Sequence, residues 1–309
     1  MKVVITGALG HIGSRLIHEI PKFFKHPEII LIDNFSTQRY VSLFNLPSAA
    51  NISFFELDTT KCDLKSIFEG AHVAIHLAAI TDAVSSFSNS RLVEENNLNS
   101  TARVAEACIA NKTRMIHLSS TSVYGSQDAV VDENCAESEL RPQSPYAETK
   151  LKEERLIRQL VCSQGLRATT FRFGTIFGTS AGMRFHTAIN KFCLQASMDQ
   201  PLTVWKTALD QKRPYLYISD AVMAIEHIIK NDLFDGTLYN VVTKNSTVSE
   251  IIEIIRLQID NLKINFVDSP IMNQLSYDVD DTRFRNTGFE PHGTLKKGIV
   301  ETLQLLAHS

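Results

Sequence analysis

The 309-residue sequence predicts an α/β fold, in which a doubly wound parallel sheet is followed by a smaller mixed α/β lobe. Short apolar runs alternate with helical stretches throughout the first half, and the pattern becomes less regular in the second half. Because each run is almost continuously apolar, it fits a parallel strand that helices cover on both faces. Alternation of strands and helices is typical of a doubly wound sheet.

Six apolar runs in the first half are expected to be strands. They span residues 3–6, 29–32, 52–57, 73–77, 115–119 and 169–173. Four stretches between them are expected to be helices, at residues 11–20, 63–68, 96–110 and 145–164. This order predicts that residues 1–173 form one lobe around a single sheet.

The second half, residues 174–309, is expected to form mainly the smaller lobe. Residues 178–209 are expected to be mostly helical, 214–218 extended, 220–230 helical and 237–242 a strand. We expect residues 214–242 to return to the first lobe. Thr247 and Glu250 have the spacing of a capping box, which predicts a helix over residues 251–259.

The composition excludes several classes of protein. A hydrophobic fraction of 44% supports a large buried core, and a net charge of −3 argues against a nucleic-acid binder. No apolar run reaches the roughly 18–20 residues that cross a bilayer. Met1 leads into strand-like residues 2–6 rather than into a secretory signal. We therefore expect a cytoplasmic protein that binds neither membranes nor nucleic acid.

The five cysteines and the histidines are scattered along the chain. No two cysteines form a CxxC pair, and no HExxH pattern occurs. We therefore expect reduced, buried thiols and no metal site.

A glycine-rich turn follows the first predicted strand. Gly7, Gly10 and Gly13 are spaced G-x-x-G-x-x-G, with His11 and Ile12 between the last two. The first glycine permits a tight turn, the second lets a pyrophosphate approach the backbone, and the third lets the helix pack closely on the sheet. The free amides at the helix N-terminus attract the pyrophosphate. This context predicts a Rossmann-type dinucleotide site.

Polar residues at later strand ends refine the choice of cofactor. Asp33, followed by Asn34, ends the second predicted strand, where a carboxylate can bind the adenosine ribose and repel a 2′-phosphate. Asp33 therefore predicts NAD rather than NADP. Asp58 could meet the adenine amino group, although an aspartate at a strand end is also common in turns. Leu77, Ala78 and Ala79 end the fourth strand, where small residues would let the backbone pass close to the dinucleotide.

Tyr146 and Lys150 form a Y-x-x-x-K pair on a predicted helix. Residues four apart share one helix face, and an ammonium near a phenol lowers the pKa of the phenol. Ser120 lies at the end of the fifth strand, where open α/β sheets place their ligands. Its hydroxyl could polarise the same C–O group that the tyrosine deprotonates.

On these motifs the chain resembles the extended short-chain dehydrogenase/reductase family, especially its NAD-dependent nucleotide-sugar epimerase and dehydratase branch. The segments that carry the resemblance are TGALGHIG (6–13), DNFST (33–37), HLAA (76–79), NNLNST (96–101), SSTSVYG (119–125), PYAETK (145–150), RFGTIFG (172–178) and RPYLYISDA (213–221).

The resemblance implies roles for individual residues. Ser120 matches the catalytic hydroxyl, Tyr146 the base and Lys150 its partner, which also holds the nicotinamide ribose. Asn99 matches an asparagine on the helix after the fourth strand and is expected in the cofactor site. The family also implies a homodimer formed through helices 96–110 and 145–164.

A second set of residues is expected to bind a nucleotide-sugar. Arg213 matches an arginine that meets the diphosphate, with a solvated ion pair as the alternative. Thr175 replaces an asparagine that touches the diphosphate in this branch, and Thr121 lies beside Ser120. Arg184 and His186 lie where substrate loops occur, unless they are ordinary surface residues.

Four functions compete. The first is an NAD-dependent nucleotide-sugar epimerase, similar to UDP-glucose 4-epimerase, that acts through a transient keto-sugar. The second is a dehydratase, which in this branch carries Asp-Glu after the catalytic hydroxyl, where this chain has Thr121-Ser122. The others are a net dehydrogenase or reductase and a non-catalytic NAD-binding scaffold. The missing acid pair favours the epimerase.

Overall fold

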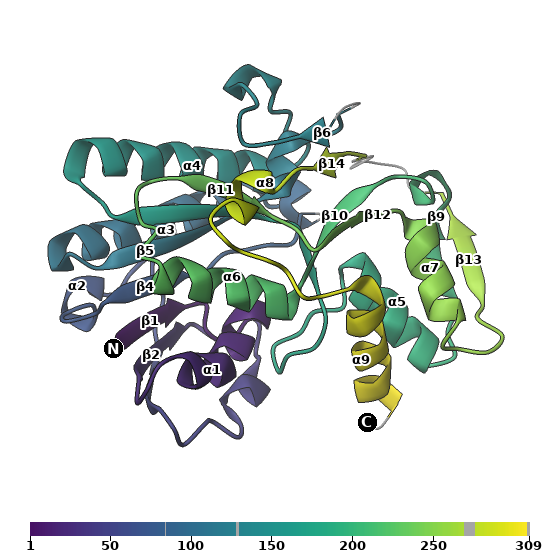
Figure 1. The fold of residues 1–309 in the computed structure, drawn as a ribbon, viewed down its shortest axis with the longest axis horizontal. Helices are drawn as coiled ribbons and strands as arrows, with labels where there is room; N and C mark the ends of the chain where they lie inside the picture. The colour runs from purple at the N-terminus through teal and green to yellow at the C-terminus, as the bar shows by residue number, and fades with distance from the viewer. Residues whose placement is uncertain (84, 128–129, 269–275, 308–309) are drawn as a thin grey trace.

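Seven parallel strands form the central sheet of the computed structural model, which describes residues 1–83, 85–127, 130–268 and 276–307 (Figure 1). The strand order is β11-β7-β5-β4-β1-β2-β3. The strands are β1 (Lys2–Thr6), β2 (Glu28–Asp33), β3 (Asn51–Glu56), β4 (Val73–His76), β5 (Arg114–Ser120), β7 (Ala168–Phe173) and β11 (Leu238–Val241). The predicted doubly wound sheet is confirmed.

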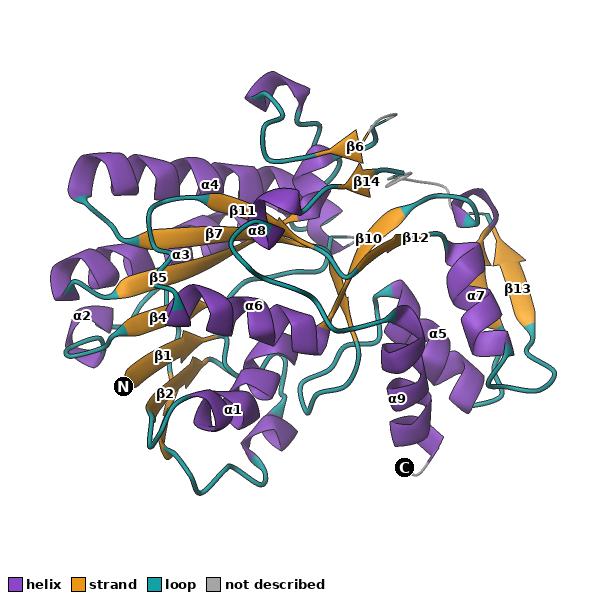
Figure 2. Cartoon of the chain, in the orientation of Figure 1, coloured by secondary structure: helices purple, strands orange, loops and turns teal. Residues whose placement is uncertain are grey.

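Helices cover both faces of this sheet (Figure 2). They are α1 (His11–Phe23) and α6 (Ile218–Lys230), which pack together, and α2 (Leu64–Ile67), α3 (Ser90–Asn111) and α4 (Pro145–Gln164). Successive side chains of a strand point to opposite faces. Accordingly Val3 and Ile5 join the core beneath α1 and α6, whereas Val4 joins the core beneath α3 and α4. No helix in the described residues is both long and apolar enough to span a membrane.

A smaller lobe lies beyond the carboxyl ends of the strands (Figure 1). Its strands are β8 (Thr175–Phe177), β10 (Arg213–Tyr217) and β12 (Lys244–Ser246) in one sheet, and β9 (Leu202–Trp205) and β13 (Ile264–Val267) in another. Its helices are α5 (Ala188–Ser197), α7 (Val248–Arg256) and α9 (Leu295–Ala307). The predicted capping box at Thr247 and Glu250 opens α7.

Short elements complete the described fold. Strands β6 (Val130–Val131) and β14 (Asp278–Val279) pair with each other, and α8 (Thr282–Arg285) follows β14. The 3-10 turns are η1 (Tyr40–Leu43), η2 (Ser85–Phe87), η3 (Thr121–Tyr124), η4 (Glu137–Glu139) and η5 (Lys206–Ala208).

Part of the segment 214–242 lies on the first lobe. Strand β11 pairs with β7 at the edge of the central sheet, and α6 packs on α1. Strand β10, by contrast, pairs with β8 in the sheet of the smaller lobe. The proposed boundary at residue 173 stays a prediction, because the core runs without a break through both parts.

Three predicted helical segments were wrong in extent. Helix α7 spans Val248–Arg256 rather than residues 251–259, because its capping box places the first turn before Ile251. Only residues 188–197 of the segment 178–209 form an α-helix, and β9 follows with alternating burial because its side chains face the core and solvent in turn. Helix α3 begins at Ser90 rather than at residue 96. Its first turns are mostly exposed, so they lack the apolar periodicity that would reveal a helix.

All five cysteines have free thiols. Cys108 and Cys193 are buried, Cys62 and Cys135 are partly buried, and Cys162 is exposed. The expectation of buried thiols was therefore wrong for Cys162, which lies near the end of α4.

Ile225 on α6 tests whether this late helix supports the first lobe. Its side chain is fully buried in the core that α1 shares with the sheet. We expect Ile225→Ala to lower the free energy of unfolding by about 2–5 kcal/mol, and Ile225→Val by about 0.5–1.5 kcal/mol, because each leaves a cavity of different size. Urea denaturation measures both values. A loss below that of the valine variant would show that α6 contributes little to this core.

Candidate active site

A cavity of about 870 Å³ lies at the carboxyl ends of the central strands and extends into the smaller lobe. Every predicted site residue except Asn99 lines it: Gly7, Gly10, His11, Ile12, Gly13, Asp33, Asn34, Asp58, Leu77, Ala78, Ala79, Ser120, Thr121, Tyr146, Lys150, Thr175, Arg184, His186 and Arg213. Predicted site residues as far apart in the chain as Gly7 and Arg213 therefore meet in one space. Among the described residues, no group of three or more His, Cys, Asp or Glu side chains could hold a metal ion.

The glycine-rich turn approaches neighbouring backbone more closely than any side chain allows. Gly7 has a φ of +66°, and a Cβ there would lie 2.6 Å from the amide nitrogen of Ala78. A Cβ on Gly13 would lie 2.4 Å from the carbonyl oxygen of Ala8. The missing side chains let α1 and the turn after β4 close around the cavity floor, where the N-terminus of α1 opens.

Asp33 supports this turn directly. One carboxylate oxygen accepts a hydrogen bond of 3.0 Å from the amide of Leu9, and the other accepts one from the amide of Phe35. The carboxylate thus ties the end of β2 to the glycine-rich turn while facing the cavity. The proposed contact with the ribose uses the remaining lone pairs of these oxygens.

Asp58 and Asn34 line the cavity but are engaged in local turns. Asp58 accepts hydrogen bonds from the amide and hydroxyl of Thr60 and lies 3.3 Å from Lys61 Nζ. Asn34 accepts one from the amide of Ser36. The turn role that competed with the adenine contact for Asp58 is therefore present, and the adenine contact stays a prediction.

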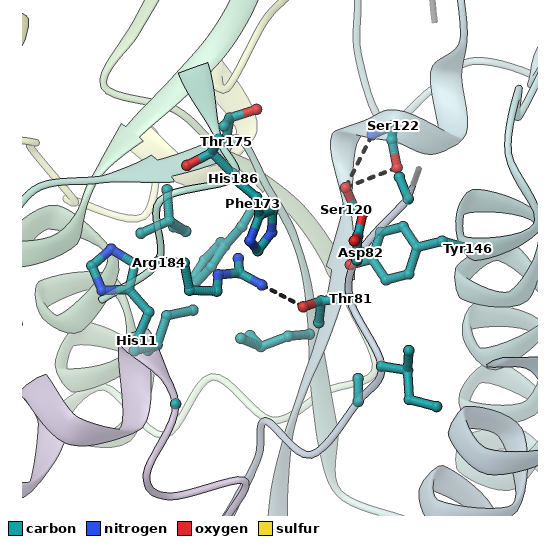
Figure 3. Close-up of a pocket in the computed structure, with 18 of the residues that line it drawn as sticks. His11, Thr81, Asp82, Ser120, Ser122, Tyr146, Phe173, Thr175, Arg184 and His186 are labelled. Carbon is teal, nitrogen blue, oxygen red and sulfur yellow. Dashed lines mark hydrogen bonds between the residues drawn. The ribbon is translucent and has the colours of Figure 1, made fainter. Parts of the chain in front are cut away.

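Ser120 ends β5 with its hydroxyl prepared to donate. Its Oγ accepts hydrogen bonds from the amide of Ser122 at 3.2 Å and from the hydroxyl of Ser122 at 2.9 Å. Both bonds use lone pairs of Ser120 (Figure 3), so its own proton is left to donate to a ligand in the cavity that it lines.

Tyr146 stands in the first turn of α4. Ser144 caps this helix by accepting a hydrogen bond from the amide of Ala147, and Pro145 begins it. The N-terminal end of a helix carries partial positive charge, which favours a phenolate there. Lys150 Nζ lies 5.9 Å from the centre of the Tyr146 ring, so the expected pair shares one face of α4.

The diphosphate candidates come from paired strands of the smaller lobe. Thr175 begins β8 and Arg213 begins β10, which runs parallel to it. Thr121, at the start of η3, donates to the carbonyl of Phe173 and accepts from Tyr277. These side chains line the same cavity as Ser120, Tyr146 and Lys150.

Arg184 and His186 reach the cavity because their loop docks on the glycine-rich turn. His11 Nδ1 lies 2.7 Å from Ser180 Oγ, and the amide of Gly182 donates to Ser14. Arg184 then donates to Thr81, and it lies across the chamber from Ser120 and Tyr146 (Figure 3). Burial, and next the charge of Arg184, lower the pKa of His11 to about 3, which keeps it neutral.

Asn99 does not line the cavity, so its proposed cofactor contact lacks support from the geometry. It is exposed on α3, whereas Asn97 is buried and bonds both the amide and the carbonyl of Ile80. Residues two positions apart on a helix are separated by about 200° around its axis, so Asn99 points away from Ile80, which Asn97 contacts. Asn96 lines the cavity instead.

Sequence reasoning also missed three charged residues in the cavity, Arg39, Asp82 and Lys191. Arg39 lies beside Asp33, where burial lowers the pKa of its guanidinium and Asp33 partly offsets that effect. Asp82 gathers with Ser120 and Tyr146 on one side of the chamber (Figure 3). Arg39 and Asp82 each follow an observed strand, β2 and β4 respectively, by six residues, so a position shortly after a strand end was the available signal.

The profile of the "NAD dependent epimerase/dehydratase family" matches residues 3–241. The chain belongs to this family. The expected membership of the extended short-chain dehydrogenase/reductases is confirmed, and NAD is the cofactor.

Two relatives illustrate the range of the family. Over 250 residues the chain is 33% identical to "Uncharacterized UDP-glucose epimerase YtcB" of Bacillus subtilis, which covers 78% of this chain and 76% of that protein. It is 30% identical, over 97% of its length, to the trifunctional UDP-glucose 4,6-dehydratase/UDP-4-keto-6-deoxy-D-glucose 3,5-epimerase/UDP-4-keto-L-rhamnose-reductase RHM1 of Arabidopsis thaliana. It spans 46% of that longer protein.

Solved structures share the fold. UDP-glucuronic acid 4-epimerase from Bacillus cereus, in complex with UDP-glucuronic acid and NAD, has a TM-score of 0.90 at 24% identity, covering 100% of this chain and 99% of that chain. DesIV, a dTDP-glucose 4,6-dehydratase from Streptomyces venezuelae, has a TM-score of 0.86 at 21% identity, covering 98% and 96%.

The cavity floor fits NAD. The close backbone packing that a Cβ at Gly7 or Gly13 would block lies at the start of α1, and the free amides of that helix end suit a pyrophosphate. Asp33 at the end of β2 and Lys150 on α4 also line the cavity, and their contacts with the two riboses stay predictions.

Asp33 should give NAD a clear advantage over NADP. A carboxylate facing a 2′-phosphate is repulsive, so we expect NADP to bind about 100-fold more weakly in calorimetric titrations. Asp33→Asn should narrow this gap, because Arg39 beside it then attracts the phosphate without opposition. Equal affinity for the two cofactors, or an unchanged gap in the variant, would contradict the role of Asp33.

Proposed function

We propose that the protein is an NAD-dependent nucleotide-sugar epimerase, similar to UDP-glucose 4-epimerase, that inverts a sugar carbon through a transient keto-sugar. One observation carries this proposal. Ser120, Tyr146 and Lys150 line the same cavity as the glycine-rich turn, while Thr121 and Ser122 follow Ser120 in place of an acid pair. The site thus has the groups for reversible oxidation of an alcohol.

Tyr146 is the base. Its phenolate is stabilised by the N-terminal end of α4 and by Lys150, and it accepts the proton of the sugar hydroxyl. Ser120 donates a hydrogen bond to the same sugar oxygen, since its lone pairs are occupied by Ser122. NAD, when bound, would accept the hydride from the carbon that carries this hydroxyl.

The part of the cavity that the smaller lobe lines would hold the nucleotide diphosphate. Arg213 and Lys191 line it with positive charge, and Trp205 offers an aromatic face for a base. Thr121, which follows Ser120 in the chain, and Thr175 also line the cavity and would contact the sugar or its diphosphate. Anchoring the diphosphate leaves the keto-sugar able to turn, so that hydride can return to its other face.

Arg184 favours a sugar that carries an anionic group. Its Nε is buried without a hydrogen-bond partner among the described residues, and the guanidinium faces Tyr146 across the chamber (Figure 3). Because a guanidinium binds carboxylates through paired hydrogen bonds, UDP-uronic acids are the first substrates to test. The Bacillus cereus relative in fold was solved with UDP-glucuronic acid.

Asp82 sustains a dehydratase as the second candidate. Its carboxylate lies in the chamber beside Ser120 and Tyr146, where it could supply the acid or base that elimination needs (Figure 3). Glu148, a second acid close to Tyr146 in the chain, is exposed and does not line the cavity. A carboxylate at position 82 is therefore the alternative to the missing pair after Ser120.

A panel of nucleotide-sugars decides between these activities. We expect one or more UDP-, GDP-, CDP- or dTDP-sugars to yield an epimer of unchanged mass without accumulation of NADH, because the hydride returns to the sugar. Mass spectrometry measures the mass of the product, NMR its stereochemistry, and absorbance the amount of NADH. A product lighter by one water would establish the dehydratase, and stoichiometric NADH would establish the dehydrogenase. Tight NAD binding without turnover of any sugar would favour the scaffold.

Tyr146→Phe tests the assignment of the base. The ring still packs while the proton acceptor is lost, so we expect kcat to fall about 100- to 10,000-fold. Unfolding temperature and NAD affinity serve as controls and should stay near those of the parent protein. A variant with nearly normal kcat would remove Tyr146 from the mechanism.

We also propose that the enzyme is a cytoplasmic homodimer. Helices α3 and α4 pack side by side, and Leu92 on α3 is 58% exposed, which an adjoining copy would cover. Analytical ultracentrifugation should give twice the mass of the chain. A monomer at micromolar concentration would refute this assembly.

A further inference from the structure

Beneath the catalytic face of α4 lies a buried polar network that the proposed reaction does not use directly. Its centre is Glu153, one turn after Lys150 on the same helix. The side chain of Glu153 is 1% exposed, and Lys150 beside it is 6% exposed. An ion pair this deeply buried is costly to desolvate, so its retention calls for an explanation.

Three donors converge on one carboxylate oxygen of Glu153. Lys150 Nζ lies at 2.9 Å from Oε2, His117 Nε2 at 3.0 Å and Thr101 Oγ1 at 3.0 Å. These donors come from α4, β5 and α3, so the carboxylate is held from three elements. Such bonds favour the ionised form, and although burial raises the pKa of Glu153, Lys150 and His117 lower it to about 2.

The donors are themselves oriented by a second row of hydrogen bonds. Thr101 is contacted by His76 Nε2, whose Nδ1 lies 2.7 Å from the hydroxyl of Thr6. His117 Nδ1 is contacted by Thr170. Burial, followed by the charges of His117 and Lys150, lowers the pKa of His76 to about 3. The neutral imidazole therefore orients Thr101 by hydrogen bonding and adds no charge to the network. Central strands β1, β4, β5 and β7 thereby all fix the position of one carboxylate.

Lys150 depends on that carboxylate for its charge. Burial by itself would lower the pKa of Lys150, but Glu153, and to a smaller extent Tyr146 and Glu154, raise it above its ordinary value. The pKa of a buried lysine without a compensating negative charge can fall by several units, so that the amine becomes neutral. A neutral amine would no longer stabilise the phenolate of Tyr146.

We propose that Glu153 is a positioning residue that holds Lys150 charged and beneath the ring of Tyr146, ready for the cofactor and the reacting hydroxyl. The proposal rests on the role given to Lys150 above. The charged or titratable groups that face this pair are His117 from β5, His76 from β4, and the Arg172–Glu154 ion pair between β7 and α4. On the cavity side, Tyr146 faces Lys150 and Arg184.

The direct test is a pH titration of Lys150 in Glu153→Gln. Glutamine keeps the shape and the hydrogen bonds but removes the charge, so we expect the pKa of Lys150 to fall by about one pH unit or more. NMR of lysine labelled at the ε-carbon measures this value, with the signal assigned by its absence in Lys150→Met. The alkaline limb of the kcat/KM profile should move to lower pH by the same amount.

Glu133→Gln is the matched control. Its carboxylate is also buried, with a side chain 1% exposed, and lies 3.8 Å from Arg283 outside the cavity. We expect this variant to lose stability while the titration of Lys150 stays where it is. If Glu153→Gln does not fold, Glu153→Asp should show a smaller shift in the same direction, because its carboxylate is retained but withdrawn.

The outcomes separate this inference from the proposed function. An unchanged titration of Lys150 in the folded glutamine variant, or in the aspartate variant when the former does not fold, would overturn the role of Glu153 even if epimerisation is normal. A lowered titration would support it even if no sugar is turned over, because the NMR measurement needs no substrate.

Discussion

The ion pair between Glu154 and Arg172 is the interaction on which the geometry of the site depends. Two hydrogen bonds, of 2.9 and 2.6 Å, join the carboxylate on α4 to the guanidinium on β7, and Ser119 donates to the same carboxylate. The pair is almost fully buried, so breaking it by removal of one partner costs about 3–5 kcal/mol. It sets the height of α4 over the sheet and therefore the position of Tyr146 relative to Ser120, the neighbour of Ser119.

The same guanidinium extends this constraint across the sheet. Arg172 lies 4.7 Å from the ring centre of Tyr124, whose hydroxyl donates to Asn240 on β11. A strand that enters the sheet late in the chain is thus coupled to the catalytic helix. Buried polar groups of this kind add little net stability, but each must find its partner, so they select one arrangement of the elements.

The second constraint is the joint between the lobes. The loop around Ser180 and Gly182 is held on the glycine-rich turn by His11 and Ser14, so the cofactor floor and the substrate wall share one surface. Arg184 follows Gly182 by two residues, so its position depends on how this loop docks on the glycine-rich turn. The proposed cofactor and sugar contacts accordingly line one cavity.

Local patterns in the sequence were sufficient for the sheet, the glycine-rich turn, the capping box of α7 and the Tyr146–Lys150 pair. Each depends on residues within a few positions of one another, where strand and helix periodicity or steric limits act directly. The contact between Asn97 and Ile80, the entry of Asp82 and Arg39 into the cavity, and the meeting of Glu153 with His117 were decided only by the tertiary structure. Those contacts join distant segments whose relative rotation no local pattern records, so the sequence could not show that Asn96 lines the cavity and Asn99 does not.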